Sequence, residues 1–373
     1  MDLIIKIATR VVTEASETKP ADALLRALLK ESRLPRADSA EVAELVFAYF
    51  RWRGWLGAEV AAAPQFEKAM DLDQRFQRDP ISFSDEELKR AVPEWTMDHV
   101  DVSGGWLRSL QARPSLWIRA KRGQGELLAK HFGEGSIADA TVPDAVQFRG
   151  ETDLFRTPEF HAGEFEIQDI ASQIVGLLCA PKPGETWWDA CAGEGGKMLH
   201  LSELMENKGL IWASDRADWR LKRLKQRAGR AKVFNYRAAL WDGSTRLPTK
   251  TKFDGILVDA PCSGVGTWQR NPHARWTTTA NDVRELGELQ KQLLTNAAAA
   301  VKPGGKLIYS VCTLTRSETD AVADFCSQAL RGFAPLALPA LPNERPASSA
   351  RRWIWPQQFF GNGMFVAAWE AAK

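Results

Sequence analysis

The sequence predicts an α/β protein in which a doubly wound, mostly parallel sheet follows an all-α domain and a small α+β subdomain. Residues 166–373 alternate between strand-like and helix-like segments, which is typical of parallel strands covered by helices on both faces. Residues 1–112 show helical periodicity with few strand-like runs, and residues 113–165 mix short strand-like and helix-like segments. These three regions are the predicted domains.

The first domain is predicted to be a helical bundle. In residues 21–31, ADALLRALLKE, leucines recur at the spacing that places them on one helix face, and residues 40–56 continue with the same spacing. In the second domain, SLWIRAKR and AVQFRG are predicted strands, with a helix over GELLAKHFGE between them.

The third domain is predicted to hold five strands that alternate with helices. They are expected over residues 185–193 (ETWWDACAG), 209–215 (GLIWASD), 231–238 (AKVFNYRA), 253–262 (FDGILVDAPC) and 304–312 (GGKLIYSVC). The fourth and fifth strands are expected to be neighbours. Ligands of such sheets bind in the crevice at the carboxyl ends of the strands, so we expect the functional residues there.

The composition excludes several classes of protein. The 373 residues are 45% hydrophobic and 26% charged, as in ordinary globular domains. No apolar run approaches the ~18 residues that a membrane span requires, and the N-terminus is too short and too mixed for a signal peptide. We therefore expect a cytoplasmic protein with no membrane partner.

The charge of the chain is informative only locally. A net charge of +2 is too small to indicate nucleic-acid binding by itself. Residues 216–232, RADWRLKRLKQRAGRAK, concentrate basic side chains around a single acid. Two interpretations of this helix-like segment stay open: a solvated helix face, or a surface that contacts phosphates.

The five cysteines do not form a metal-binding pattern. None of them makes a C-x-x-C pair, and only five histidines accompany them, so no metal site is predicted. Their odd number and wide spacing also argue against a disulfide framework. Cys179 and Cys326 lie in apolar helix-like segments and are expected to pack in the core, whereas Cys262 and Cys312 lie just past predicted strands.

A glycine-rich turn follows the first strand of the third domain. Glycines 193, 195 and 196 allow the backbone to approach a ligand, and the next helix offers free N–H groups. Asp215 ends the second strand about twenty residues later, where an acid binds ribose hydroxyls in dinucleotide-type folds. Asp242 follows the third strand. A tight turn and exposed turn aspartates are the alternative interpretations.

Several ordered motifs resemble the NOP/Sun family of RNA cytosine-5 methyltransferases. DACAGEGGK is similar to the family's DACAAPGGK, and FEIQDIASQ is similar to FxVQDxSSQ. DAPCSGVGTWQRNPHARW is similar to DAPCSGxGxxRRxPxxxW, and YSVCTLTRSE is similar to YSTCSxxxxE. The resemblance covers residues from about 115 to the C-terminus. It implies a Rossmann-like, class I methyltransferase domain that uses S-adenosylmethionine.

The resemblance extends more weakly to the front of the chain. ELVFAYFRWRGWL and Pro93-Glu94-Trp95 are similar to the NusB-like RNA-binding domain of the bacterial ribosomal RNA members. The resemblance implies an RRM-like arrangement for the α+β linker subdomain. It also favours small-subunit (16S) ribosomal RNA as the substrate. We separately expect the protein to act as a monomer.

The resemblance implies a role for each motif residue. Cys312 attacks carbon 6 of the cytosine, because a thiolate is a strong nucleophile that also leaves readily, and Cys262 assists release. Asp259 hydrogen-bonds the cytosine edge, and Lys197 supports placement and helps to lower a thiol pKa. The implied cofactor site comprises Cys191, Ala192, Gly193, Glu194, Gly195, Gly196, Lys197, Asp215, Asp242 and Asp259, and the implied RNA contacts are Arg270, Arg275 and Trp276.

The chain departs from the family pattern at three places. Gly193-Glu194 stands where the family has Ala-Pro, Val311 replaces a threonine, and Thr319 replaces an asparagine. Two alternative functions stay open: cytosine-5 methylation of transfer RNA, and RNA binding by a catalytically weak ribosome-assembly factor. Methylation of DNA or of an exocyclic amine is disfavoured, because neither needs a cysteine at the position of Cys312.

Overall fold

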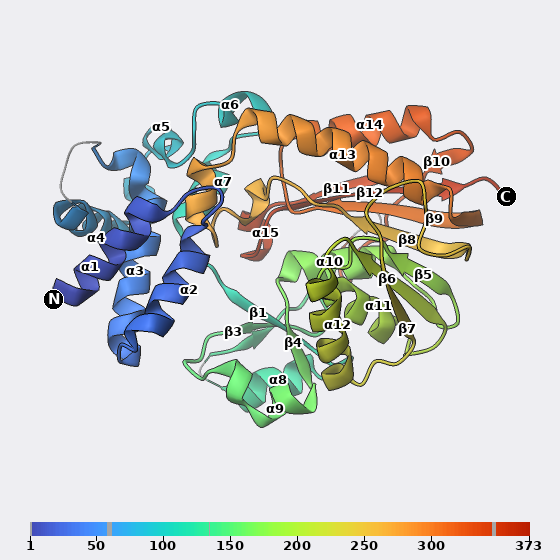
Figure 1. Ribbon diagram of the computed structural model, residues 1–373, viewed down its shortest axis with the longest axis horizontal. Helices are drawn as coiled ribbons and strands as arrows, with labels where there is room; N and C mark the ends of the chain where they lie inside the picture. Colours follow the sequence, from blue (N-terminus) through green and yellow to red (C-terminus); the bar gives the residue numbers. More distant parts are fainter. Residues whose placement is uncertain (1, 58–61, 134, 345–347) are drawn as a thin grey trace. The chain divides into compact units, whose positions relative to one another are not determined.

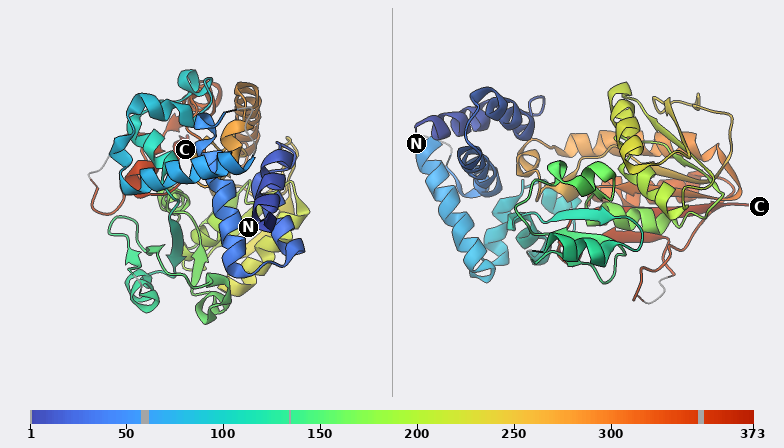
Figure 2. Two further views of the ribbon diagram at one scale, coloured as in Figure 1. Left: turned by 90° about the vertical axis from the view of Figure 1, so that its left-hand side faces the viewer. Right: turned by 90° about the horizontal axis from the view of Figure 1, so that it is seen from below.

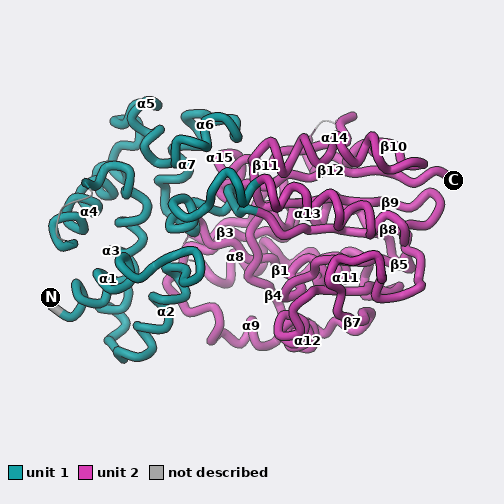
Figure 3. The backbone as a smooth tube through the Cα atoms, turned by 45° about the horizontal axis from the view of Figure 1, so that its top comes forward, with its two compact units in different colours: residues 1–114, 263–283 teal, residues 115–262, 284–373 magenta. Residues whose placement is uncertain are grey.

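The computed structural model describes residues 2–57, 62–133, 135–344 and 348–373. The chain divides into two compact units, which Figure 3 colours separately. Unit 1 comprises residues 1–114 and 263–283, and unit 2 comprises residues 115–262 and 284–373. The first boundary lies close to the predicted one at residue 112. The assignment of residues 263–283 to unit 1 was not predicted from the sequence.

The N-terminal part of unit 1 is helical, as predicted. Its helices are α1 (Asp2–Glu14), α2 (Ala21–Ser32), α3 (Arg36–Trp52), α4 (Ala62–Arg78), α5 (Asp85–Leu88), α6 (Thr96–His99) and α7 (Gly104–Gln111). The apolar stripe of α2 buries Leu25 and Leu28 against Val42 and Val46 of α3. The helical spacing read from residues 21–56 therefore identified a real packing face.

Unit 2 contains a small antiparallel sheet of the predicted α+β kind. Its elements are β1 (Leu116–Ala120), α8 (Gly125–Phe132), β2 (Ile137–Ala138), β3 (Ala145–Phe148), α9 (Pro158–Ala162) and β4 (Phe165–Ile167). The strand order is β2-β3-β1-β4, with antiparallel neighbours throughout. The two predicted strands are β1 and β3, whereas the two edge strands escaped prediction because they are only two and three residues long.

The large sheet of unit 2 has the predicted parallel centre. Its main strands are β5 (Thr186–Asp189), β6 (Leu210–Asp215), β7 (Tyr236–Leu240), β8 (Phe253–Asp259), β9 (Val301–Val311), β10 (Phe333–Pro335) and β12 (Met364–Ala371), and β11 (Arg351–Ile354) pairs with β12. The order is β10-β12-β9-β8-β5-β6-β7, parallel from β9 to β7. The predicted fourth and fifth strands, β8 and β9, are neighbours.

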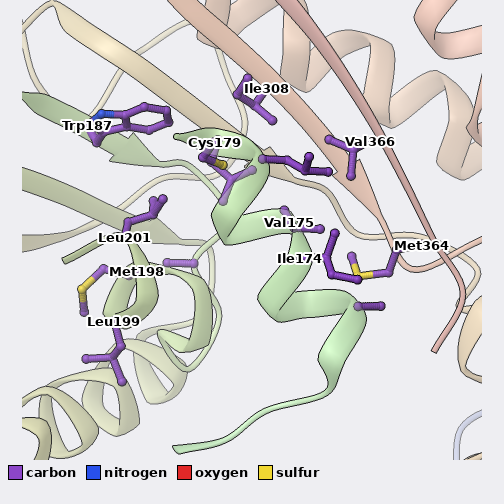
Figure 4. Packing of buried hydrophobic residues seen from close by; sticks show 14 of the residues in the cluster. Ile174, Val175, Cys179, Trp187, Met198, Leu199, Leu201, Ile308, Met364 and Val366 are labelled. Carbon is purple, nitrogen blue, oxygen red and sulfur yellow. The ribbon is translucent and has the colours of Figure 1, made fainter. Parts of the chain in front are cut away.

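Helices cover both faces of this sheet (Figures 1 and 2). They are α10 (Ile170–Cys179), α11 (Gly196–Leu204), α12 (Asp218–Ala231), α13 (Ala280–Ala298), α14 (Asp320–Ala329) and α15 (Pro356–Phe359). One apolar cluster joins Trp187 and Ile308 to α10 and α11 (Figure 4), and a second joins Trp188 and Leu307 to α13 and α14. Successive strand residues enter opposite clusters, as the two-residue period of a strand requires.

Among the described residues, no helix is both long and apolar enough to cross a bilayer.

Candidate active site

Cys262 and Cys312 lie together where two neighbouring strands end. Cys262 follows β8 by three residues, and Cys312 directly follows β9. Because β8 and β9 are parallel neighbours, their carboxyl ends bring the two thiols to an Sγ–Sγ distance of 3.2 Å. The hydrogen bond with Cys262 lowers the pKa of the Cys312 thiol below its usual value, against the opposing effect of burial.

Asp259, at the end of β8, holds a cation and a hydroxyl beside the two thiols. Its Oδ2 lies 2.6 Å from Lys197 Nζ, and its Oδ1 accepts a hydrogen bond of 2.6 Å from Ser310 Oγ. Burial by itself favours neutral Lys197, but Asp259 outweighs it and raises the lysine pKa above its usual value. The predicted catalytic residues therefore form one cluster of two thiols and an ion pair.

The glycine turn between β5 and α11 is shaped by two left-handed residues. Gly193 and Gly195 have φ of +54° and +87°. A Cβ on Gly195 would lie 2.7 Å from the Leu224 side chain, so only glycine fits there. The Gly193 amide donates to Asp215 Oδ2 at 3.1 Å, and Asp215 Oδ1 accepts from the Ala217 amide. The acid at the end of β6 thus holds the turn in place.

The acid that replaces proline in this turn has a partner. The Glu194 carboxylate lies 2.7 Å from Arg223 Nη1 of α12, and the Glu194 carbonyl accepts a hydrogen bond from Arg227. This departure from the family motif therefore adds an ion pair between the turn and α12.

A pocket of about 310 Å³ opens beside the turn in unit 2. It is lined by backbone and side chains from residues 190–193 together with Asp215, Asp242 and Asp259. Trp241, Arg216, Arg220, Leu289 and Leu293 also line it and were not predicted as site residues. Its volume lies at the lower end of the range for small-molecule sites. A half-apolar wall and acids at the strand ends suit a nucleoside with an attached amino-acid chain.

A second cavity, of about 210 Å³, shares Cys191, Ala192 and Asp259 with the first pocket. Asp189, Lys197 and Asp259 line it together with Gln168, Ser172, Cys191 and Arg227. Burial, reinforced by the charge of Asp259, raises the pKa of Asp189 to about 8. Because Cys191 and Asp259 line both spaces, a ligand in the first pocket has a path toward the ion pair.

A buried hydrogen-bond network supports the two cysteine-bearing segments. Gln290 Nε2 of α13 donates to the Pro261 carbonyl at 2.9 Å and to Glu318 Oε1 at 3.0 Å. Glu318 Oε2 in turn accepts from the hydroxyls of Thr313 and Thr315. One amide group therefore ties the residue before Cys262 to the loop after Cys312. The motif YSVCTLTRSE contains Glu318 and both threonines, but Gln290 comes from α13, 28 residues earlier in the chain.

The remaining cysteines behave as packing residues. Cys179 and Cys326 are fully buried, and burial raises the pKa of both thiols, that of Cys326 to about 12. Burial likewise raises the pKa of Cys191 in the glycine turn. The core role predicted for Cys179 and Cys326 is confirmed. No group of three metal-ligating side chains was found among the described residues.

The three predicted RNA contacts all lie in unit 1. Arg270 is exposed. Arg275 is fully buried, and its guanidinium donates to the carbonyls of Trp268, Ala91 and Leu110 and to Gln111 Oε1. The Trp276 indole donates to the Phe50 carbonyl at 2.7 Å. This placement corrects the expectation for Arg275, because a buried guanidinium engaged by its own chain cannot reach a phosphate. Trp276 is likewise engaged with α3.

The sheet order, the glycine turn after β5 and the acids at the strand ends define a Rossmann-like domain of the methyltransferase class. Residues 176–370 match the family described as 16S rRNA methyltransferase RsmB/F, and the chain belongs to this family.

Relatives and a solved structure extend this finding. The chain is 39% identical, over 62% of its length, to a probable ribosomal RNA small subunit methyltransferase B of Synechocystis sp., and the match spans just over half (55%) of that protein. It is 32% identical to ribosomal RNA small subunit methyltransferase B of Shewanella oneidensis, over 77% of this chain and 69% of the relative. The crystal structure of PH0851 shares the fold, with a TM-score of 0.80 and 24% identity over 98% of this chain and 97% of that one.

Proposed function

We propose that this protein methylates carbon 5 of a cytosine in 16S ribosomal RNA, using S-adenosylmethionine. The observation that carries the proposal is the Cys262–Cys312 pair beside the Lys197–Asp259 ion pair. Its support is the family match and the named function of the relatives. Carbon 5 of cytosine is a poor nucleophile, so the ring must first gain an electron pair from an added nucleophile.

Cys312 is the nucleophile in this proposal. Its thiol has the lowered pKa that raises the thiolate fraction at neutral pH. Attack on carbon 6 places negative charge on the far side of the ring. Asp259 and Lys197 stand beside the thiols. There the Asp259 carboxylate can accept a hydrogen bond from the amino group of the base, and the Lys197 cation can stabilise the negative charge.

Cys262 acts after methyl transfer in this scheme. Its sulfur lies 3.2 Å from the attacking sulfur, which is close enough to exchange a proton with groups on carbon 5 and carbon 6. Its expected role is to assist removal of the carbon-5 proton and release of Cys312 from the product.

S-adenosylmethionine, when bound, supplies the methyl group as an electrophile. The residues that would hold it are those of the 310 Å³ pocket: the turn at 191–193, Asp215 and Asp242. Asp215 is already oriented by two backbone amides, which fixes its carboxylate for a polar ligand. Glu194 to Lys197 complete the turn that the motif implies.

The base must leave its stack to reach the two thiols, because a duplex hides carbon 6. An unpaired or flipped cytosine of the ribosomal RNA is therefore the proposed substrate. Exposed Arg270 remains a proposed phosphate contact. Action in the cytoplasm as a monomer remains part of the proposal.

Product analysis tests the reaction and the RNA class together. The protein is incubated with labelled S-adenosylmethionine and either unmodified 16S ribosomal RNA or unmodified transfer RNA, and the RNA is digested to nucleosides. Label in 5-methylcytidine from ribosomal RNA alone is expected. Label from transfer RNA alone would replace the substrate, and cofactor binding without any label would favour an assembly factor. Cys326→Ala, a buried cysteine outside the site, is the matched control for Cys312→Ala.

A further inference from the structure

A surface groove of about 620 Å³ lies at the β7 edge of the large sheet, beside α12. Figure 1 shows β7 next to this helix, and β7 is the last strand at its end of the sheet. The groove shares no lining residue with either cavity of the active site. It is therefore a separate feature of unit 2, and the proposed reaction does not use it.

Aromatic rings form one wall of the groove. Phe234 is 75% exposed, and Trp212 and Tyr236 are partly exposed. The chain leaves α12 through Lys232, which has left-handed backbone, and β7 begins only at Tyr236. Phe234 thus lies in the connection, outside the sheet pairing, with its ring in solvent. A phenylalanine ring that is largely exposed to water is unfavourable, and it adds nothing to the stability of the core.

Two basic side chains also line the groove. Lys225 and Arg237 are exposed, and neither takes part in an ion pair among the described residues. Arg237 lies opposite Trp212 in the β6–β7 register, with its guanidinium 5.8 Å from that ring. No acidic side chain lines the groove.

The other bases of α12 differ, because they have internal partners. Lys222 pairs with Asp218 at 2.7 Å, and Arg223 pairs with Glu194. Arg227 and Arg230 both pair with Glu166. The bases of α12 thus divide into those that pair with a carboxylate and Lys225, which lines the groove, a difference that the sequence alone did not show.

We infer that this groove binds single-stranded RNA, with bases stacked on Phe234 and Tyr236 and phosphates held by Lys225 and Arg237. Exposed rings beside unpaired cations are the two parts of a sequence-tolerant single-strand site. The inference rests on the proposed function for the identity of the polymer, and it assigns the groove to a stretch of the substrate other than the target cytosine. An acidic peptide would satisfy the cations but would leave the ring wall without a planar partner.

Fluorescence anisotropy with a labelled oligouridylate of about 12 nucleotides, within the range of single-strand sites, tests the inference directly. Lys225→Ala/Arg237→Ala should weaken binding about tenfold. It should also reduce the slope of log affinity against log salt by roughly 1.4, since each lost phosphate contact removes about 0.7. Lys222→Ala on the same helix is the matched control and should bind as the wild type does.

The aromatic wall is tested separately. Phe234→Leu keeps apolar bulk but removes the ring, and it should weaken binding severalfold with an unchanged salt slope; Phe234→Trp should restore the affinity. Circular dichroism confirms that each variant is folded. Affinities within twofold of wild type for both the basic and the ring variants would overturn the inference, and an acidic peptide bound less tightly by these variants would replace RNA as the occupant.

Methyl transfer to ribosomal RNA, measured in the same proteins, separates the two proposals. Reduced affinity with a raised KM and an unchanged kcat is the expected result. Normal binding of the oligouridylate by all variants, together with normal methylation, would end the groove assignment and leave the proposed function intact. Loss of binding by the variants, with no methylation by the wild type, would contradict the proposed function and leave the groove assignment intact.

Discussion

The thiol of Cys312 has surroundings that the other cysteines lack. Burial raises the pKa of Cys179, Cys191 and Cys326, which leaves them inert as nucleophiles. Cys312 has a second thiol at 3.2 Å and Lys197 in its vicinity, and its pKa is lowered. A group with this pattern, close to the pocket-lining Lys197, is a candidate for catalysis, because functional sites are where pKa values are most often displaced.

Alkylation measures this effect on the free protein. Because the hydrogen bond with Cys262 is the largest cause of the lowered pKa, Cys262→Ala should shift the pH profile of iodoacetamide labelling at Cys312 to higher pH. Labelling at neutral pH should slow severalfold, whereas the rates should converge at high pH, where both thiols are ionised. Peptide mass spectrometry gives the rate at Cys312 itself. An identical profile in the two proteins would contradict this account of the thiol.

The motifs predicted the residues that bear reactive groups. They did not predict which side chains hydrogen-bond to those residues. Cys262, Cys312, Asp259 and Lys197 stand in compact motifs, so their proximity followed from the order of the strands. Ser310 is also in a motif, but its hydrogen bond to Asp259 depends on the β8–β9 register. Arg275 was misjudged because a charged residue in a motif gives no sign that its chain will bury it.

At the scale of elements, α13 connects the ends of β8 and β9. Gln290 donates to the Pro261 carbonyl and to Glu318, and the Tyr309 hydroxyl donates to Gln290 Oε1 at 2.8 Å. The side chains of Gln290, Glu318 and Tyr309 are buried, so a lost partner leaves a polar atom of these side chains without water. The network keeps the two cysteine-bearing segments at a fixed separation.

Substitution of Gln290 tests that connection. Gln290→Ala should lower the free energy of unfolding by about 1–3 kcal/mol, because the buried Glu318 carboxylate loses a donor and the buried Tyr309 hydroxyl loses an acceptor. Gln290→Glu should be worse, since it places a second carboxylate against Glu318. Urea unfolding and kcat for methyl transfer are the measurements, with exposed Gln226→Ala on α12 as the control. Wild-type values for both Gln290 variants would show that the network does not position the thiols.

The order of helices and strands in unit 2 was predictable from the sequence. The residues at which they begin and end were harder to predict. The strands over 253–262 and 304–312 were expected from runs of apolar residues between turn residues, and β8 and β9 lie there. The strand expected over 231–238 instead runs from Tyr236 to Leu240. Val233 and Phe234 have strand-forming side chains. However, α12 ends only at Lys232, so these two residues form the connection between the helix and β7.

At the scale of the whole molecule, the stability of unit 1 depends on a segment distant in sequence. Arg275 reaches the carbonyls of Ala91 and Leu110, more than 160 residues earlier in the chain. Such pairing leaves no local periodicity, so the assignment of residues 263–283 to unit 1 could not be predicted. Short strands and long-range contacts limited the prediction of the domains, whereas periodicity within elements supported it.

Two arginines close together in the sequence, buried Arg275 and exposed Arg270, are expected to differ in role: the first stabilises unit 1 and the second contacts RNA. Arg275→Met should lower the free energy of unfolding by roughly 3 kcal/mol, because several buried carbonyls lose their donor. Exposed Arg270→Ala should leave stability unchanged and weaken RNA binding, with a smaller salt slope. Thermal unfolding and RNA titration of both variants decide the matter. Equal stability of Arg275→Met and wild type would contradict the structural role of the buried guanidinium.

Asp189 makes the stability of the protein depend on pH. The folded protein holds the Asp189 proton up to a pKa of about 8, whereas an ordinary aspartate releases it near 3.8. The folded state therefore binds more protons between these values, and the free energy of unfolding falls as pH rises through this window. Asp189→Asn should flatten the decline between about pH 5 and pH 8 by up to a few kcal/mol. An unchanged slope in urea unfolding would argue that this carboxyl is ionised in the folded protein.

In the proposed reaction, Cys312 forms a covalent bond to the cytosine that is methylated. The most direct measurement is the isolation of that adduct from the Cys262→Ala protein, in which release is expected to be slow, after incubation with ribosomal RNA and S-adenosylmethionine. We expect a protein–RNA complex that survives denaturation, is attached through Cys312 and is absent from Cys262→Ala/Cys312→Ala. Attachment at another residue, or continued formation of 5-methylcytidine by Cys312→Ala, would contradict it.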